Sequence, residues 1–147
     1  MPNALDVAKF FLAQANEEAG DLVSNLKLQK LVYYAQGFHL AVFDEPLFSE
    51  RIEAWMHGPV VPDVYHTYRG HGAGSIPVPA DFDPSVFSDD QIDLLNEVQQ
   101  IYGQYSAWRL REMTHEEAPW KDSYKPDTMN LEIPQDGMRE FFKGLLK

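Results

Sequence analysis

Apolar side chains recur at helical spacing over residues 26–43, and this pattern predicts the central element of the fold. They form a stripe made of Leu28, Leu31, Val32, Ala35, Phe38 and Val42, which is widened by Leu26, Tyr34, Leu40 and Ala41. A helix that is apolar on most sides lies in the middle of a domain. We therefore expect a central helix that starts after a cap at Ser24 or Asn25, stops before Pro46 and is surrounded by the other elements.

A first helix is predicted upstream of the central one. Asn3 is a suitable N-cap, and Asp6 stands three residues later in the position of a capping box. Its inner face consists of Leu5, Ala8, Phe11, Leu12 and Ala15. We expect this helix to end near Gly20, because glycine readily takes the left-handed conformation that ends helices.

Apolar and polar side chains alternate over residues 51–57, which predicts a half-buried strand. The inner side has Ile52, Ala54 and Met56, and the outer side has Arg51, Glu53, Trp55 and His57. An outward Trp55 indicates that another element covers it. Gly58 and Pro59 are expected to end the strand, and Pro62 fits the first turn of a helix that ends at Gly70.

The rest of the chain predicts a long loop followed by short helices. Residues 70–90 are rich in Gly and Pro and are expected to form an ordered loop, with a short edge strand as an option. Capping boxes at Ser88/Gln91 and Thr114/Glu117, and a cap at Ser106, predict three helix starts. A strand at residues 131–133 is expected to pair with residues 51–56, and a last helix starts at Pro134. Its inner face is Met138, Phe141, Phe142 and Leu145.

Together these elements predict a mainly α fold with a small antiparallel β-sheet, an α+β arrangement. We expect residues 1–147 to form a single compact domain built around the central buried helix. The chain has 44% hydrophobic residues and 13% aromatic residues, so it has enough apolar surface for a core.

The charge balance is strongly acidic, with a formal net charge of -11 from 12 basic and 23 acidic residues. Such a surface repels phosphate backbones, so we expect no direct contact with nucleic acid. It favours a basic protein partner, or it serves solubility alone. The sequence has no bilayer-spanning apolar run and no secretory leader, which predicts a cytoplasmic protein without membrane contact.

Catalytic and metal-binding patterns find little support. His115, Glu116 and Glu117 resemble the start of a zinc-protease motif, but Pro119 occupies the place of the second histidine. The chain has no cysteine, no nucleophile elbow and no phosphate-binding loop. Arg109 and Arg111 are expected to form internal ion pairs. We predict no catalytic residue, no metal and no cofactor, and therefore no enzyme.

Two separate stretches resemble a known family. LKLQKLVYYAQG at residues 26–37, followed by IEAW at 52–55 and HGPVVP at 57–62, forms the first. SAWRL at residues 106–110 and THEEAPW at 114–120 form the second. In this order they resemble the Panacea domain family, which includes phage-associated GepA-like proteins and SocA-like antitoxins.

The resemblance implies an antitoxin of a type II toxin–antitoxin pair. Such an antitoxin binds its cognate protein toxin, encoded by an adjacent gene, and holds it inactive. An alternative is a proteolytic adapter that delivers the toxin to the ClpXP protease, and a small hydrolase using His57 or His115 ranks last. Some relatives add a helix-turn-helix region, which we do not expect here because one helix precedes residue 26.

Two sets of residues follow from these interpretations. Aromatic and polar side chains near the strand and the helix after it are candidates for toxin contact, since such residues anchor interfaces: Trp55, His57, Val61, Asp63, Tyr65, Tyr68 and Arg69. The resemblance implies a mostly structural role for the signature residues: Leu28, Lys30, Leu31, Tyr34, Gly58, Pro59, Trp108, Thr114, His115, Pro119 and Trp120.

Overall fold

The computed structural model describes residues 1–15 and 22–146 of the chain. Within these residues it has seven α-helices and a two-stranded antiparallel sheet, which confirms the predicted fold class. The α-helices are α1 (Ala4–Ala13), α2 (Asn25–Phe43), α3 (Pro62–Tyr68), α4 (Asp89–Tyr102), α5 (Ala107–His115), α6 (Ala118–Lys121) and α7 (Gln135–Leu145). The strands are β1 (Glu53–Trp55) and β2 (Gly58–Val60), and short 3-10 turns occupy Arg69–His71 and Pro84–Val86.

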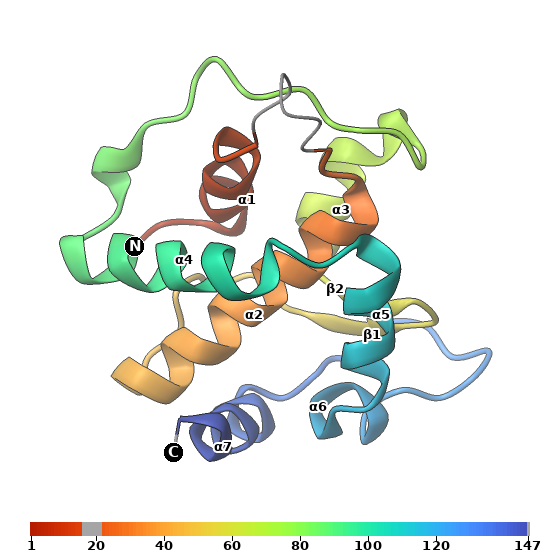
Figure 1. The fold of residues 1–147 in the computed structure, drawn as a ribbon. Coiled ribbons are helices and arrows are strands. Elements are labelled where there is room, and N and C mark those ends of the chain that lie inside the picture. Colours follow the sequence, from red (N-terminus) through yellow and green to blue (C-terminus); the bar gives the residue numbers. More distant parts are fainter. Residues whose placement is uncertain (16–21, 147) are drawn as a thin grey trace.

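Helix α2 is the central element, as predicted. It runs through the middle of the molecule in Figure 1 and contacts α1, α3, α4, α5, α7 and β2. The Ser24 hydroxyl accepts a hydrogen bond from the Lys27 N–H, so Ser24 is the N-cap. The helix ends at Phe43 because Asp44 takes a left-handed conformation, with φ of 57°. Val42 lies in the last turn and is exposed, so its predicted place in the core is wrong.

The C-terminal half of α2 packs against aromatic side chains from α4 and α7. The rings of Tyr34 and Tyr102 stack with their centroids 4.0 Å apart. Phe142 of α7 lies edge-on to Phe38 at 4.8 Å. A side chain at Gly37 would overlap the Phe142 ring, so glycine at this position lets α7 approach α2 closely. Met138 and Phe142 are buried as predicted, whereas Leu145 in the last turn is exposed.

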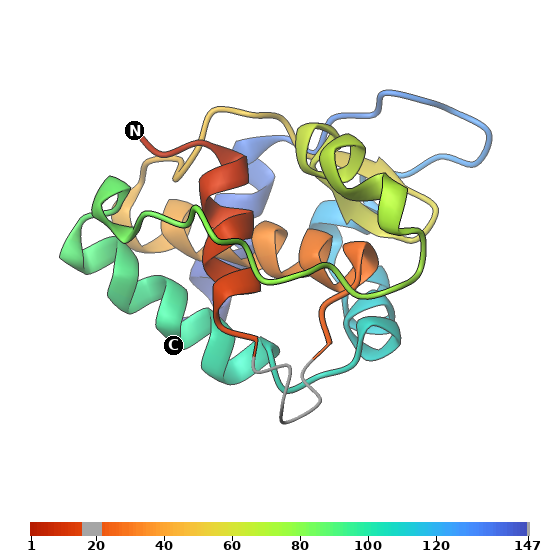
Figure 2. The same cartoon turned by 90° about the horizontal axis from the view of Figure 1, so that it is seen from above.

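Helix α1 is shorter than predicted but starts as expected. The Asn3–Asp6 capping box is formed, and the helix ends at Ala13. Gly20, its predicted end, lies outside the described residues. In Figure 2 the segment between α3 and α4 crosses α1. Phe82 and Phe87 of this segment lie edge-on to Phe10 of α1, with ring centroids 6.1 and 6.3 Å away, and Lys9 pairs with Asp81 at the surface, so the predicted loop is packed on α1.

Two of the three predicted helix starts after residue 87 are confirmed. The Ser88–Gln91 capping box opens α4, and the Ser106 hydroxyl caps α5. The Thr114–Glu117 capping box is wrong, because α5 continues through Thr114 and this hydroxyl donates to the Arg111 carbonyl oxygen at 2.9 Å. Helix α6 begins after Glu117 without a side-chain cap bond.

The predicted pairing of residues 51–56 with residues 131–133 is confirmed as an isolated antiparallel bridge between Glu53 and Glu132. The Ala54 N–H donates to the Leu131 carbonyl oxygen and the Ile133 N–H to the Ile52 carbonyl oxygen, both at 2.8 Å. The prediction missed the main partner of β1, which is β2, directly after it in sequence, in the register Glu53 to Val60. Gly58 was expected to end a strand, but its φ of 113° instead allows a two-residue turn. Met56 lies in that turn and is 61% exposed, so its predicted inner position is wrong as well.

Candidate functional site

The β1–β2 hairpin carries two exposed side chains at its tip. Trp55 lies opposite Gly58 in the antiparallel register, so only Met56 and His57 connect the strands. Both connecting residues are exposed. Glu53, expected on the outer side, is buried and accepts a hydrogen bond from Trp55 Nε1 at 3.0 Å. The hairpin therefore combines an exposed tip with a polar contact near its base.

Polar side chains of α2 bind the backbone of the hairpin from inside the molecule. Lys30 Nζ donates to the Pro59 carbonyl oxygen at 3.1 Å, and Gln29 Oε1 accepts from the Val61 N–H at 2.9 Å. Gln29 Nε2 in turn donates to Asn25 Oδ1 at 2.8 Å. Because buried backbone groups and amides need partners, these bonds fix β2 on α2.

Side chains of α5 and α6 bind the hairpin from the other direction. Trp120 Nε1 donates to the Trp55 carbonyl oxygen at 2.7 Å. His115 Nε2 donates to the Met56 carbonyl oxygen at 3.0 Å. The His115 and Trp120 rings lie 4.1 Å apart, so they also support one another. The two stretches of the family-like sequence thus meet at the hairpin.

Arg111 of α5 contacts the tip of the turn. Its Nε donates to His57 Nδ1 at 2.9 Å, and its Cζ lies 4.5 Å from the centroid of the Trp108 ring. The predicted ion pairs of Arg109 and Arg111 are wrong, because neither arginine forms one with any side chain that the structure describes.

Lys30 is fully buried directly beneath the turn. Burial, with a contribution from the positive charge of Arg111, lowers the pKa of Lys30 to about 7. A Cβ at position 58 would lie 2.7 Å from Lys30 Cε and 2.8 Å from Thr114 Oγ1. Gly58 is therefore required twice, for its φ and for the space that it leaves to Lys30 and Thr114.

A hollow of about 440 Å³ opens beside the hairpin. Its wall includes Leu26, Lys30, Trp55, His57, Tyr65 and Arg69. The Trp55 and Tyr65 rings meet edge to face with centroids 4.8 Å apart. The expectation that another element covers Trp55 is thereby confirmed, and that element is α3.

The residues predicted to contact a toxin fall into three groups. Trp55, His57, Tyr65 and Arg69 line the hollow. Asp63 is exposed on α3, and Tyr68 is half-buried at its end. Val61 is fully buried and its N–H is bound by Gln29, so this residue is excluded from a contact surface.

Most of the residues given a structural role lie inside the molecule. The buried ones are Leu28, Lys30, Leu31, Tyr34, Gly58, Pro59, Thr114 and Pro119. His115 and Trp120 are half-buried. Trp108 is 57% exposed, so it does not occupy a buried position.

Glu117 is half-buried and links the α5–α6 junction to α2. Its carboxylate oxygens accept hydrogen bonds from Tyr33 Oη at 3.0 Å and Tyr34 Oη at 2.8 Å. Burial raises the pKa of Glu117 to about 7, against the opposing effect of the two tyrosine hydrogen bonds. The sequence interpretation as a capping residue missed this role.

Sequence reasoning also missed several residues around the turn. Asn25 and Gln29 are polar residues four apart on a mostly apolar helix, and this spacing was a signal that they bond to each other. Arg111 and Met56 gave no such signal, because their position depends on the packing of α5 against the hairpin.

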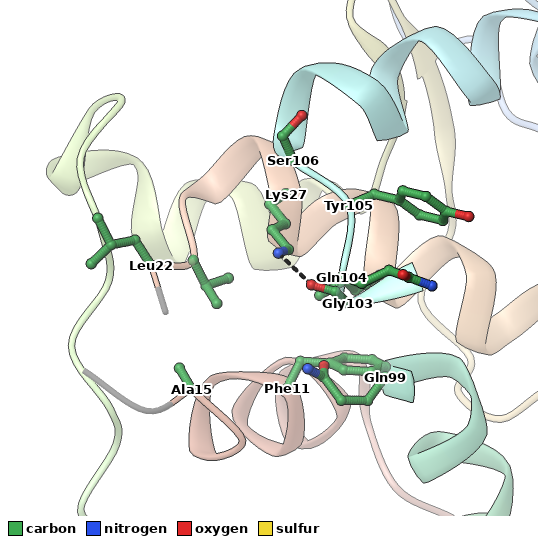
Figure 3. Close-up of a pocket in the computed structure, with 11 residues that line it drawn as sticks. Phe11, Ala15, Leu22, Lys27, Gln99, Gly103, Gln104, Tyr105 and Ser106 are labelled. Atoms are coloured by element: carbon green, nitrogen blue, oxygen red, sulfur yellow. Dashed lines mark hydrogen bonds between the residues drawn. The ribbon is translucent and has the colours of Figure 1, made fainter. Parts of the chain in front are cut away.

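A second cavity, of about 380 Å³, lies between α1, α2 and the α4–α5 junction. Figure 3 shows Lys27 reaching the Gly103 carbonyl oxygen, a hydrogen bond of 2.7 Å, with Phe11 and Gln99 on the wall. The wall contains none of the residues predicted to contact a partner. Among the described residues, no group of three His, Asp or Glu side chains is placed to hold a metal ion.

Comparisons with known proteins agree with the resemblance seen in the sequence. Residues 28–121 match the family model described as antitoxin SocA-like, Panacea domain. Over 50 residues the chain is 46% identical to antitoxin SocA of Caulobacter vibrioides (strain NA1000 / CB15N). That match covers 34% of this chain and 27% of the relative, so it spans about a quarter of the relative's length. No solved structure matches the chain significantly. In the described part of the chain, no helix has the length and apolar character needed to cross a membrane.

Proposed function

The chain belongs to the family of SocA-like antitoxins with a Panacea domain, and from this premise we propose that it neutralises a protein toxin by binding it directly. In this proposal it is the antitoxin of a type II pair, its toxin is encoded by an adjacent gene, and both act in the cytoplasm. The family itself indicates an antitoxin role. Residues 28–121, which match the family model, include the whole hairpin, α3 and α5.

The observation that supports this proposal most directly is the hollow beside the hairpin. Trp55 and Tyr65 are half-buried there, and Met56 is exposed at its rim. Interfaces between proteins are enriched in tyrosine, tryptophan and methionine, and the two aromatic side chains contribute large contact areas at a low entropic cost. A side chain of the toxin inserted between the hairpin and α3 would complete the burial of both rings.

The net charge of -11 supports a protein partner of opposite charge. Charge complementarity accelerates encounter and suppresses wrong partners more than it adds affinity. A basic toxin would be attracted to this chain over about 10 Å at moderate ionic strength. Nucleic acid would be repelled by the same field.

The proposal is tested by co-expressing the chain with the product of the adjacent reading frame. We expect a stable complex and rescue of growth. Tyr65→Ala should weaken the complex about tenfold or more, because truncating an aromatic anchor removes a large contact. Tyr105→Ala is the matched control, since Tyr105 is also half-buried but lines the other cavity.

The two variants separate binding from folding. We expect both to melt within a few degrees of each other, with only Tyr65→Ala losing affinity. If the wild-type chain gives neither a complex nor growth rescue, the proposed function is wrong. Equal affinities for both variants would move the contact surface away from the hollow.

A further inference from the structure

Four basic side chains gather around the hairpin turn. Arg111 bonds to His57, His115 bonds to the Met56 carbonyl oxygen, and Lys30 lies beneath Gly58. Within residues 1–15 and 22–146, no acidic side chain forms a hydrogen bond or ion pair with any of these four basic residues. We call Lys30, His57, Arg111 and His115 the turn cluster.

The lack of a counter-charge is unusual for this chain, which has about two acidic residues for each basic one. Other cations are paired: Lys9 with Asp81, Arg51 with Glu53 and Lys143 with Asp44. Arg111 is therefore a cation without a carboxylate partner among the described residues, and the other three members place further nitrogen groups around it. Burial, followed by the positive charges of Arg111 and Lys30, lowers the pKa of both histidines.

The donors of the turn cluster are held in place before any ligand arrives. Nε of Arg111 is used by His57, and the Trp108 ring lies against the guanidinium, so the direction of the remaining N–H groups is fixed. His57 accepts at Nδ1, so its other nitrogen, Nε2, carries the hydrogen. His57 is exposed, and Arg111 is partly exposed. Preorganised, charge-assisted donors of this kind bind a carboxylate well.

We propose that the turn cluster binds a carboxylate side chain of the neutralised protein. This inference rests on the proposed function and specifies which chemistry the toxin must present there. A carboxylate of the toxin would supply the counter-charge that Arg111 lacks among the described residues. The contact combines with the aromatic hollow, since His57 and Lys30 line both. A nucleic-acid phosphate is disfavoured because the chain as a whole carries a charge of -11.

The first experiment measures the affinity of the complex with the product of the adjacent reading frame. Arg111→Gln keeps hydrogen-bonding groups but removes the charge, and it should weaken binding about tenfold or more. Arg109→Gln is the matched control on the same helix, because Arg109 is exposed and does not touch the turn. It should bind within about twofold of the wild type, which is the range for a rim charge. Replacing the toxin carboxylate that contacts the turn with its amide should give the same loss, with no further loss when combined with Arg111→Gln.

The second experiment uses the free chain and does not need the toxin. Acetate or inorganic phosphate is added at constant ionic strength, and the His57 and His115 ring signals are followed by NMR. We expect saturable shifts with acetate that disappear in Arg111→Gln and persist in Arg109→Gln. A stronger response to phosphate would overturn the assignment to a carboxylate, and no saturable response to either anion would show that the cluster is not a preformed site.

The outcomes separate this inference from the proposed function. If the wild-type chain binds the toxin and Arg111→Gln binds equally well, the inference is overturned and the antitoxin function stands. If the wild-type chain binds no toxin, the antitoxin function and the assignment of the carboxylate to a toxin both fail. The acetate titration then decides only whether the turn cluster is an anion site.

Discussion

The two halves of α2 perform different tasks. The N-terminal half carries Asn25, Gln29 and Lys30, whose side chains are buried and directed at other polar groups. The C-terminal half is packed by Tyr34 and Phe38 against aromatic rings of α4 and α7. Packing of apolar surface stabilises a fold without direction, whereas hydrogen bonds fix one particular geometry. Both halves contribute to the core, and Gln36 in the C-terminal half also bonds the backbone of Leu47 and Phe48, but the polar contacts to the hairpin come from the N-terminal half.

The largest effect on stability is expected from a substitution in the aromatic packing around the C-terminal half of α2. Phe142→Ala removes a fully buried ring that contacts Tyr33, Tyr34 and Phe38. We expect the free energy of unfolding to fall by about 3–5 kcal/mol, as for other buried Phe to Ala changes. Urea denaturation measures this loss. Toxin affinity at a temperature where the variant is still folded should stay close to wild type, and a loss of affinity without a loss of stability would contradict the division between the halves.

The next effect lies where the two halves meet, at Glu117. Its pKa is raised from 4.5 to about 7, so the folded state binds more protons than the unfolded state between these pH values. The free energy of unfolding therefore falls as pH rises through this window, by about 3 kcal/mol at ~1.4 kcal/mol per pKa unit. Glu117→Gln should remove this part of the fall, as measured by urea denaturation from pH 4.5 to 7.

Lys30 acts in a different pH window and serves as an internal check. Its pKa is lowered from 10.5 to about 7, so between these values the unfolded state binds more protons. Its contribution to stability consequently rises with pH above about 7. Lys30→Met should flatten that rise and leave the slope below pH 7 unchanged. Identical slopes for Glu117→Gln and the wild type would show that Glu117 is not the group that titrates.

The smallest effect on stability is expected from a substitution in the hairpin turn, which the polar side chains of α2 support. Gly58→Ala places a side chain at φ of 113° and against Lys30 and Thr114, which should cost about 1–3 kcal/mol. It should weaken toxin binding as well, because the turn moves. Gly70→Ala is the control, since its Cβ meets no atom within 4 Å. Equal stability of the two variants would mean that the turn relaxes freely and is not fixed from beneath.

Local patterns explain which parts of the fold were predictable. The caps at Asn3, Ser88 and Ser106 depend on residues three apart, and α2 depends on a long periodic stripe, so all were found from the sequence. The hairpin was missed because a glycine that ends a strand and a glycine that turns it look alike until its φ is known. The role of Glu117 was missed because its hydrogen-bond partners, Tyr33 and Tyr34, lie more than 80 residues away in the sequence.

The candidate site was partly predictable for a similar reason. Trp55, Tyr65 and Arg69 were selected as surface aromatic and polar residues near one strand, and they do share the hollow. The turn cluster draws one member from α2, one from the hairpin and two from α5. Only packing brings such distant positions together, and a charge that lacks a partner is visible only once all neighbours are known.

The arrangement around the hairpin restricts how another protein can dock. At the β2 edge, Lys30 binds the Pro59 carbonyl oxygen, and Gln29 binds the N–H of Val61, the residue after β2. At the β1 edge, the Ala54 N–H donates to the Leu131 carbonyl oxygen at 2.8 Å, and Trp120 binds the Trp55 carbonyl oxygen. A hairpin whose two edges already form hydrogen bonds is a poor template for the addition of a strand from another protein. A partner that docks at the hairpin is therefore expected to bind through side chains and not by adding a strand.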